Sequence, residues 1–202
     1  MRKIGVVIFA FVLMAQMANA QAELAIGIKG GVNFATLNAN SSVSANYKNH
    51  TGYNAGAFVL IKLGKIGIQP EVLFSEQGSK VTFPTSSQNF TSTFNYVNVP
   101  ILFKLYTIAG INLQLGPQFG FLTNSPVVKS TVNGNYVTVN DAYRKSDLSA
   151  AMGIGWDLPF GLSVDARYNL GLSKIQSANN PNDTKNQVFQ VSIGYKLIKL
   201  GH

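Results

Sequence analysis

Residues Gln187 to Leu197 read QVFQVSIGYKL and, from Phe189, alternate between apolar and polar side chains. From Phe189 onward the odd positions are apolar, whereas Gln190, Ser192, Gly194 and Lys196 stand between them. A side-chain period of two is that of a β-strand with one apolar and one polar face. The stretch therefore predicts a strand that lies between two different environments.

The same alternation recurs along the chain, for example from Leu148 to Leu158 and from Leu162 to Leu170. Together with the turn residues it predicts eight strands, at Glu23 to Phe34, Gly52 to Leu63, Ile66 to Gln77, Thr93 to Tyr106, Gly110 to Leu122, Asp147 to Leu158, Gly161 to Ser173 and Gln187 to Ile198. Repeated strands of this length are typical of a closed barrel. We expect an all-β fold, an eight-stranded antiparallel up-and-down transmembrane β-barrel.

The connections between these strands alternate in length. Short turns are expected at Gly64-Lys65, at Thr107 to Ala109 and at Pro159-Phe160, and long polar loops at Ala35 to Thr51, Gly78 to Ser92, Thr123 to Ser146 and Lys174 to Asn186. Barrels of the outer membrane have short periplasmic turns and long external loops. Within the third long loop, Asn133-Gly134 between Val127 to Val132 and Tyr136 to Val139 predicts a hairpin.

Composition indicates whether the apolar face of the predicted barrel wall points outward or inward. A soluble surface needs about 25–35% charged residues, whereas this chain has 12%. Gly, Ser, Ala, Asn and Gln dominate the polar face and are small enough for a narrow lumen. We therefore expect the apolar face to point outward, to lipid.

Aromatic residues are expected to form two girdles at the membrane interfaces. The long-loop girdle would hold Phe34, Tyr53, Phe74, Phe94, Phe121, Tyr168 and Phe189, and the short-turn girdle Trp156, Phe160, Tyr106 and Tyr195. Pro70, Pro100 and Pro117 fall inside predicted strands, where each lacks a ladder donor. Bulges at these three positions would reconcile them with the wall.

The N-terminus predicts export. Arg2 and Lys3 precede an apolar stretch from Ile4 to Met17, and Ala18-Asn19-Ala20 is a cleavage pattern. We expect a signal peptide at 1–20 and a single barrel domain at 21–202. Loss of Arg2 and Lys3 with the leader lowers the formal charge from +8 to +6. The chain has no cysteine, and its remaining basic residues are scattered singly, so neither a thiolate site nor a nucleic-acid surface is expected.

Charged residues of both signs fall on the inward register. They are Lys29, Lys62, Glu71, Lys104, Asp157, Asp165, Arg167 and Lys196. A narrow lumen would force these charges to pair, because a lone buried charge is costly. We expect a salt-bridge plug of Glu71, Arg167, Lys29, Lys104 and Asp165, with Glu71 and Arg167 as the bidentate pair. A proton or ion path, or a catalytic carboxylate pair, is the functional alternative.

No catalytic, cofactor or metal constellation can be recognised in the sequence. His50 and His202 have no evident partner residues, and the loop serines lack a positioned base. Gly27, Gly30 and Gly31 precede no helix and so form no phosphate loop. We therefore expect no cofactor.

Several segments are similar to one known family. They include GIKGGVNF at 27–34, IQPEVLFS at 68–75, VNVPILFK at 97–104, Gly116-Pro117, DARY at 165–168 and IGYKL at 193–197. In order and spacing these segments resemble the PorT-type outer-membrane β-barrel family. The resemblance implies an eight-stranded membrane barrel in which the strand prolines are tolerated. The family's namesake is associated with protein secretion, a role that fold similarity alone does not transfer.

The leading functional hypothesis is an integral outer-membrane protein that is not an enzyme and whose external loops bind a partner or stabilise the envelope. Outer-membrane lipid and an envelope or secretion-machinery protein are the expected partners, and the barrel is expected to be monomeric. A narrow pore is the second hypothesis. A soluble exported carrier like a lipocalin and a lipid-modifying enzyme that uses His50 and a loop serine are the remaining ones.

Overall fold

The computed structural model describes residues 22–39, 46–82, 89–123, 127–130, 136–138, 146–172 and 184–201. They form ten strands: β1 Ala22–Ala39, β2 Asn46–Leu63, β3 Ile66–Thr82, β4 Asn89–Tyr106, β5 Ile111–Leu122, β6 Val127–Ser130, β7 Tyr136–Thr138, β8 Ser146–Asp157, β9 Leu162–Gly171 and β10 Thr184–Gly201. The predicted leader at 1–20 and the Asn133-Gly134 turn lie outside these ranges. Within them, no helix is long and apolar enough to cross a membrane.

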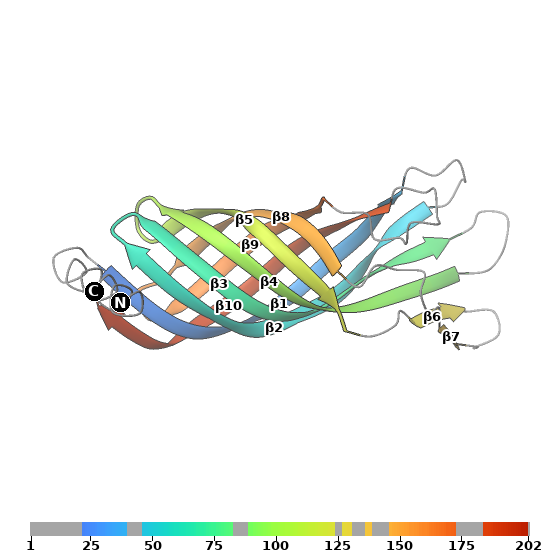
Figure 1. Ribbon diagram of the computed structural model, residues 1–202, viewed down its shortest axis with the longest axis horizontal. Coiled ribbons are helices and arrows are strands. Elements are labelled where there is room, and N and C mark those ends of the chain that lie inside the picture. The colour runs from blue at the N-terminus through green and yellow to red at the C-terminus, as the bar shows by residue number, and fades with distance from the viewer. Residues whose placement is uncertain are drawn as a thin grey trace, which may run out of the picture.

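Eight of the strands close an antiparallel barrel. Their order is β3-β2-β1-β10-β9-β8-β5-β4, and pairing of β3 with β4 closes the ring. Figure 1 shows the strands tilted around a long barrel, with the short turns at one end. Glu23 at the start of β1 is opposite Gly201 at the end of β10, so both ends of the wall lie at the short-turn end. The predicted eight-stranded fold is confirmed.

The predicted strand limits are accurate at one end of the barrel and too short at the other. At the short-turn end they agree with the structure within one residue, except that β10 runs on to Gly201. At the long-loop end β1 to β4 continue four to six residues further than predicted. Backbone pairing continues there to Asn46↔Thr82 and Thr82↔Asn89 although the apolar alternation has stopped. The backbone ladder requires only peptide groups, so it continues where the side chains no longer alternate. The apolar alternation marks only the part of each strand that has an apolar outer face.

The predicted hairpin in the third long loop is present as β6 and β7, which pair from Val127↔Thr138 to Lys129↔Tyr136. Strand β6 also pairs with β4, from Phe90↔Ser130 to Thr93↔Val127. This pair of strands lies at the end of the barrel opposite the short turns (Figure 1). It adds two strands to the wall beyond the closed part.

The expected bulges at the three prolines are absent. Phe58↔Glu71 and Ile61↔Ile68 keep one register across Pro70, and Leu73↔Asn98 and Pro70↔Ile101 keep one register across Pro100. The same holds between Pro100↔Gln118 and Phe103↔Leu115 on either side of Pro117. The ladder is interrupted instead of shifted, because leaving a few bonds unmade preserves the face of every following side chain.

A β-bulge occurs in β10, at a position where the sequence pattern did not predict one. Ile26 pairs with Ile198 and Gly27 pairs with Lys196, so Leu197 is the extra residue. Leu197 and Ile198 are consequently both exposed although they are neighbours. An inserted residue shifts the strand by half its side-chain period. Beyond the bulge, Leu200 lies on the outer face together with Ile198.

The apolar face points outward, as predicted from composition. Ile28, Leu115 and Ile193 are 52%, 60% and 59% exposed, although they belong to the middle of the wall. The polar face lines a filled interior in which Asn33, Asn112 and Arg167 are at most 1% exposed. The lumen is not wholly polar, because Phe58, Leu60, Leu73, Tyr96 and Leu102 are also buried there. These apolar side chains come from the adjacent strands β2, β3 and β4.

Two residues assigned to the aromatic girdles face the lumen instead. Phe94 is 3% exposed and Tyr106 is 5% exposed, so neither can contact lipid. Both share the inward register of β4 with Asn98 and Lys104, and their size fills space beside smaller polar side chains. The other nine side chains are exposed on the outer face or at a turn: Phe34, Tyr53, Phe74, Phe121, Tyr168, Phe189, Trp156, Phe160 and Tyr195. In the long-loop group Phe34 stacks on Phe189, with ring centroids 6.3 Å apart.

Candidate functional site: an ion network in the barrel lumen

The charged residues predicted to face inward meet in the middle of the barrel. Lys29 on β1, Glu71 on β3, and Asp165 and Arg167 on β9 are all at most 4% exposed. Each lies on the register opposite the lipid-facing one, since their neighbours Ile28, Val72 and Val164 are exposed. Strand alternation alone therefore directs these four side chains to the same narrow space.

Glu71 is the centre of this group. Arg167 binds it through two parallel contacts, Nη1 to Oε2 at 3.0 Å and Nη2 to Oε1 at 3.1 Å. Lys29 Nζ donates to Glu71 Oε1 at 3.0 Å, and Gln69 Nε2 donates to the same oxygen at 2.7 Å. A carboxylate held by a planar guanidinium fork and an ammonium is strongly oriented. The pair favoured by the sequence is thus in direct contact.

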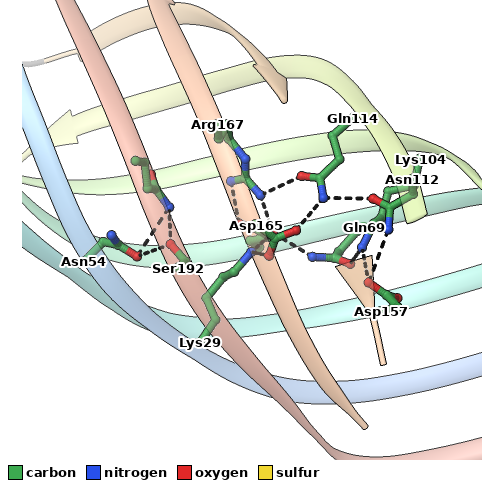
Figure 2. Close-up of polar contacts among 12 residues, drawn as sticks. Lys29, Asn54, Gln69, Lys104, Asn112, Gln114, Asp157, Asp165, Arg167 and Ser192 are labelled. Atoms are coloured by element: carbon green, nitrogen blue, oxygen red, sulfur yellow. Dashed lines mark hydrogen bonds and ion pairs between the residues drawn. The ribbon is translucent and has the colours of Figure 1, made fainter. Parts of the chain in front are cut away.

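Asp165 joins the group from the same strand as Arg167. Its Oδ2 lies 2.8 Å from Lys29 Nζ, so one ammonium bridges two carboxylates. Gln114 Nε2 donates to Asp165 Oδ1, and Gln114 Oε1 accepts from Arg167 Nη2 at 3.2 Å. Figure 2 shows Arg167 and Asp165 of β9 meeting Gln114 of β5 and Lys29 of β1. The amide connects an anion and a cation that belong to one strand.

A second group lies nearer the short-turn end, around Asp157. Lys104 Nζ contacts Asp157 Oδ1 at 3.1 Å, and Tyr106 donates its hydroxyl to Oδ2 at 2.9 Å. Lys196 Nζ lies 3.2 Å from the same Oδ2 and 2.6 Å from Glu23 Oε1. Lys104 also donates to Gln69 Oε1 at 3.0 Å, which links this group to Glu71. The two groups form one continuous network.

Apart from the exposed Lys199, whose Nζ lies 3.9 Å from Glu23 Oε2, the network is balanced in charge. Its four carboxylates, Glu23, Glu71, Asp157 and Asp165, each contact at least one of its four cations, Lys29, Lys104, Arg167 and Lys196. Burial of an ion costs several kcal/mol, which close opposite charges and hydrogen bonds offset. Each of these carboxylates is held by a neighbouring cation inside the barrel. The arrangement is suited to closing the lumen.

Sequence reasoning missed several members of the network and assigned Tyr106, which contacts Asp157, to an aromatic girdle instead. Glu23, Gln69 and Gln114 were not predicted, although each shares the inward parity of its strand. Lys62 faces inward as predicted, but its Nζ lies 4.3 Å from the centre of the Tyr106 ring instead of beside a carboxylate. That contact is a cation–π interaction. The alternation of side chains along each strand places Glu23, Gln69 and Gln114 on the inward face. A buried amide or carboxylate needs a hydrogen-bonding partner, so the sequence could have indicated these residues.

An uncharged layer lies beyond the ions, toward the long-loop end. Asn54 Nδ2 donates to Asn33 Oδ1 at 2.8 Å, and Ser192 Oγ donates to Asn54 Oδ1 at 3.1 Å. A polar cavity of about 10 Å³, lined by Gln118, Ser149 and Asn169 among others, lies in the same half of the barrel. Such a volume holds about one water molecule. The cavity is far smaller than an ion channel.

Within the described ranges no group of three or more His, Cys, Asp or Glu could hold a metal ion. His50 occupies the register position opposite Ala35 on β1. His202 lies outside the described residues.

Residues 14–177 match the family described as outer membrane protein beta-barrel domain. The chain belongs to this family. Its closed barrel and exposed apolar belt are what such a domain requires, and the protein is accordingly located in the outer membrane. Comparison with the curated proteins gives no significant match.

Solved structures of other outer-membrane barrels resemble this one in fold. Neisserial surface protein A is 10% identical with a TM-score of 0.55, and the match covers 85% of this chain and 97% of that one. The attachment invasion locus protein Ail of Yersinia pestis is 17% identical with a TM-score of 0.51, covering 89% of this chain and 99% of that one. At these identities the likeness concerns the barrel alone.

Proposed function

We propose that this outer-membrane barrel is a sealed, non-enzymatic display protein. It spans the membrane with a filled lumen and presents its long-loop end to a partner or to the envelope surface. The observation that carries the proposal is the Lys29–Glu71–Arg167–Asp165 cluster, which occupies the centre of the lumen with paired, buried charges. Strands β1 to β4 and the β6–β7 hairpin supply the external platform.

Other parts of the hypothesis rest on the sequence. The leader at 1–20 supports export with cleavage after Ala20. The PorT-type resemblance supports an association with protein secretion, in which the external platform would contact another envelope protein. The soluble carrier is no longer a candidate, because a lipocalin-like barrel would turn its apolar face inward and this barrel turns it outward.

The pore hypothesis is tested in planar lipid bilayers. Purified wild-type barrel should give no conductance steps, because its central cations and carboxylates fill the lumen. The double variant Glu71→Ala and Arg167→Ala should give small steps, since it removes two large lumen side chains and leaves a net-neutral space. The variant also serves as the control that protein inserts under the same conditions. Conductance by the wild-type barrel that changes in the double variant would show that the protein is a pore.

A further inference from the structure

The small polar cavity in the long-loop half of the lumen is enclosed by six strands. Its lining residues come from β3, β4, β5, β8, β9 and β10, and Val188 is the one apolar residue among them. Gln118 of β5 pairs with Ser149 of β8, and Ala151, the next inward residue of β8, pairs with Asn169 of β9. The cavity of about 10 Å³ thus lies inside the ring and takes one particle of the size of a water molecule.

Two carbonyl oxygens of the cavity wall have no hydrogen-bond partner among the residues that the structure describes. They are Gln118 Oε1 and Asn169 Oδ1, and their side chains belong to residues that are only 4% and 3% exposed. Buried polar atoms of folded proteins almost always meet a partner, which can be another residue, a water molecule or an ion. Two such oxygens from different strands around one small space indicate a particle bound between them.

The hydrogen-bond donors of two lining amides are engaged outside the cavity. Gln77 Nε2 donates to Ser75 Oγ at 3.0 Å, and Asn169 Nδ2 donates to Gln190 Oε1 at 3.5 Å. A buried water molecule needs donors for its lone pairs as well as acceptors for its protons. A cation needs oxygen ligands alone. A wall that offers mainly acceptors therefore favours a cation.

The composition of the wall favours a monovalent cation over a divalent one. Among the described lining residues Asp147 is the one acid, and the other polar residues are amides and a serine. Ca²⁺ is usually bound by several carboxylates, whereas neutral carbonyl oxygens are enough to replace the water shell of K⁺. Arg167 precedes Asn169 by two residues on β9, toward the short-turn end, and is paired with Glu71. The ion network therefore closes the lumen on that side of the cavity.

We propose that Gln118 and Asn169 hold one monovalent alkali cation, K⁺ or Na⁺, between their side-chain oxygens. The ion enters from the long-loop end and is bound without crossing the barrel. It joins β5 to β9 beyond the ion network and stabilises the folded ring according to its concentration and affinity. The inference goes beyond the sealed display function, because it assigns a ligand to the long-loop half of the lumen.

The test follows the thermal unfolding midpoint of the purified full barrel in detergent while KCl or NaCl replaces choline chloride at constant ionic strength. Choline has the same charge but is too large for the cavity. The wild-type midpoint should rise and then saturate, which gives an apparent dissociation constant. Asn169→Leu should raise that constant about 10- to 100-fold, because one contact with the ion is lost. Asn54→Leu makes the same change in the uncharged layer outside the cavity and should leave the constant unchanged.

Gln118→Met is the second variant, which removes the other oxygen and keeps the contact of Asn169 with Gln190. It should also raise the apparent dissociation constant at least about tenfold. Equal midpoints in KCl, NaCl and choline chloride would overturn the proposal and leave the cavity to a water molecule. An equal loss of cation dependence in Asn54→Leu would overturn the assigned site, and saturation by CaCl₂ at far lower concentration would overturn the monovalent class. None of these readouts depends on conductance, so the sealed-barrel function is tested separately.

Discussion

Glu71 shows how a single buried residue closes the lumen. It receives two hydrogen bonds from Arg167 of β9, one from Lys29 of β1 and one from Gln69 of its own strand. These contacts cross the barrel and join strands that are not neighbours in the wall. The carboxylate therefore braces the closed ring from inside as well as filling it.

Removal of one partner of the Glu71–Arg167 pair should cost more than removal of both. Arg167→Met leaves Glu71 with Lys29 as its only cation, and the loss of a buried partner typically costs about 3–5 kcal/mol. The double variant Glu71→Met and Arg167→Met should recover part of that free energy of unfolding. Urea titration in lipid vesicles measures all four corners of the cycle. Additive losses would show that the two groups are not coupled.

Gly31 and Gly30 offer a matched pair of neighbours. A Cβ on Gly31 would lie 2.0 Å from the Val191 carbonyl oxygen, whereas the nearest atom to a Cβ on Gly30 is 3.5 Å away. Gly31→Ala should lower the free energy of unfolding by more than about 1 kcal/mol, and Gly30→Ala should be neutral or stabilising. The same urea titration compares them. Equal effects would mean that the wall relaxes around Gly31.

At the scale of elements, the wall divides into a closed part formed by all eight strands and an extension of β1 to β4 at the long-loop end. Strands β5, β8 and β9 end close to their predicted limits at both ends, whereas β1 to β4 continue outward. Among the residues that the structure describes, β6 joins the wall through its ladder with β4, in four residue pairs from Phe90↔Ser130 to Thr93↔Val127. The hairpin is therefore an appendage to the closed barrel.

Replacement of residues 124–145 by a short Gly-Ser linker should leave the barrel intact. The closing pairs β3–β4 and β5–β8 do not involve the hairpin. We expect the unfolding midpoint to change little, because every ladder of the closed ring stays complete. Circular dichroism during thermal unfolding measures the midpoint. Loss of folding would show that the hairpin nucleates the wall.

At the scale of the whole molecule, the protein is a cylinder whose apolar side chains face outward and whose charged side chains face inward, the reverse of a soluble protein. Its outer belt exposes residues such as Leu115 and Ile193, while Arg167 and Lys104 are buried inside. Only lipid or detergent can cover such a belt without association between molecules. The closed ladder leaves few unpaired strand edges within the membrane part.

The closed barrel should resist SDS until it is heated. Unheated protein from detergent-solubilised membranes should migrate faster on a gel than boiled protein, because the compact ring binds less SDS than the unfolded chain. The Gly31→Ala variant should shift at a lower temperature, whereas Gly30→Ala should behave like the wild type. Identical mobility of heated and unheated protein would contradict a stable closed barrel.

The sequence by itself determined the strand number, the short-turn ends and the outward apolar face. These features follow from a side-chain period of two and from turn residues, both of which are local. Parity also directed Lys29, Glu71, Asp165 and Arg167 inward, because strand geometry alone sets that face. The choice of Glu71 with Arg167 needed only the rule that buried charges pair.

Tertiary structure decided which positions meet. Phe94 and Tyr106 share the strand parity of Lys104, so parity could have placed both in the lumen, but the contact of Tyr106 with Asp157 required the folded barrel. The bulge at Leu197 and the unbroken register across the prolines depend on how strands pair. Pairing is set by closure of the whole ring, which is a property of eight strands together. No local pattern contains that information.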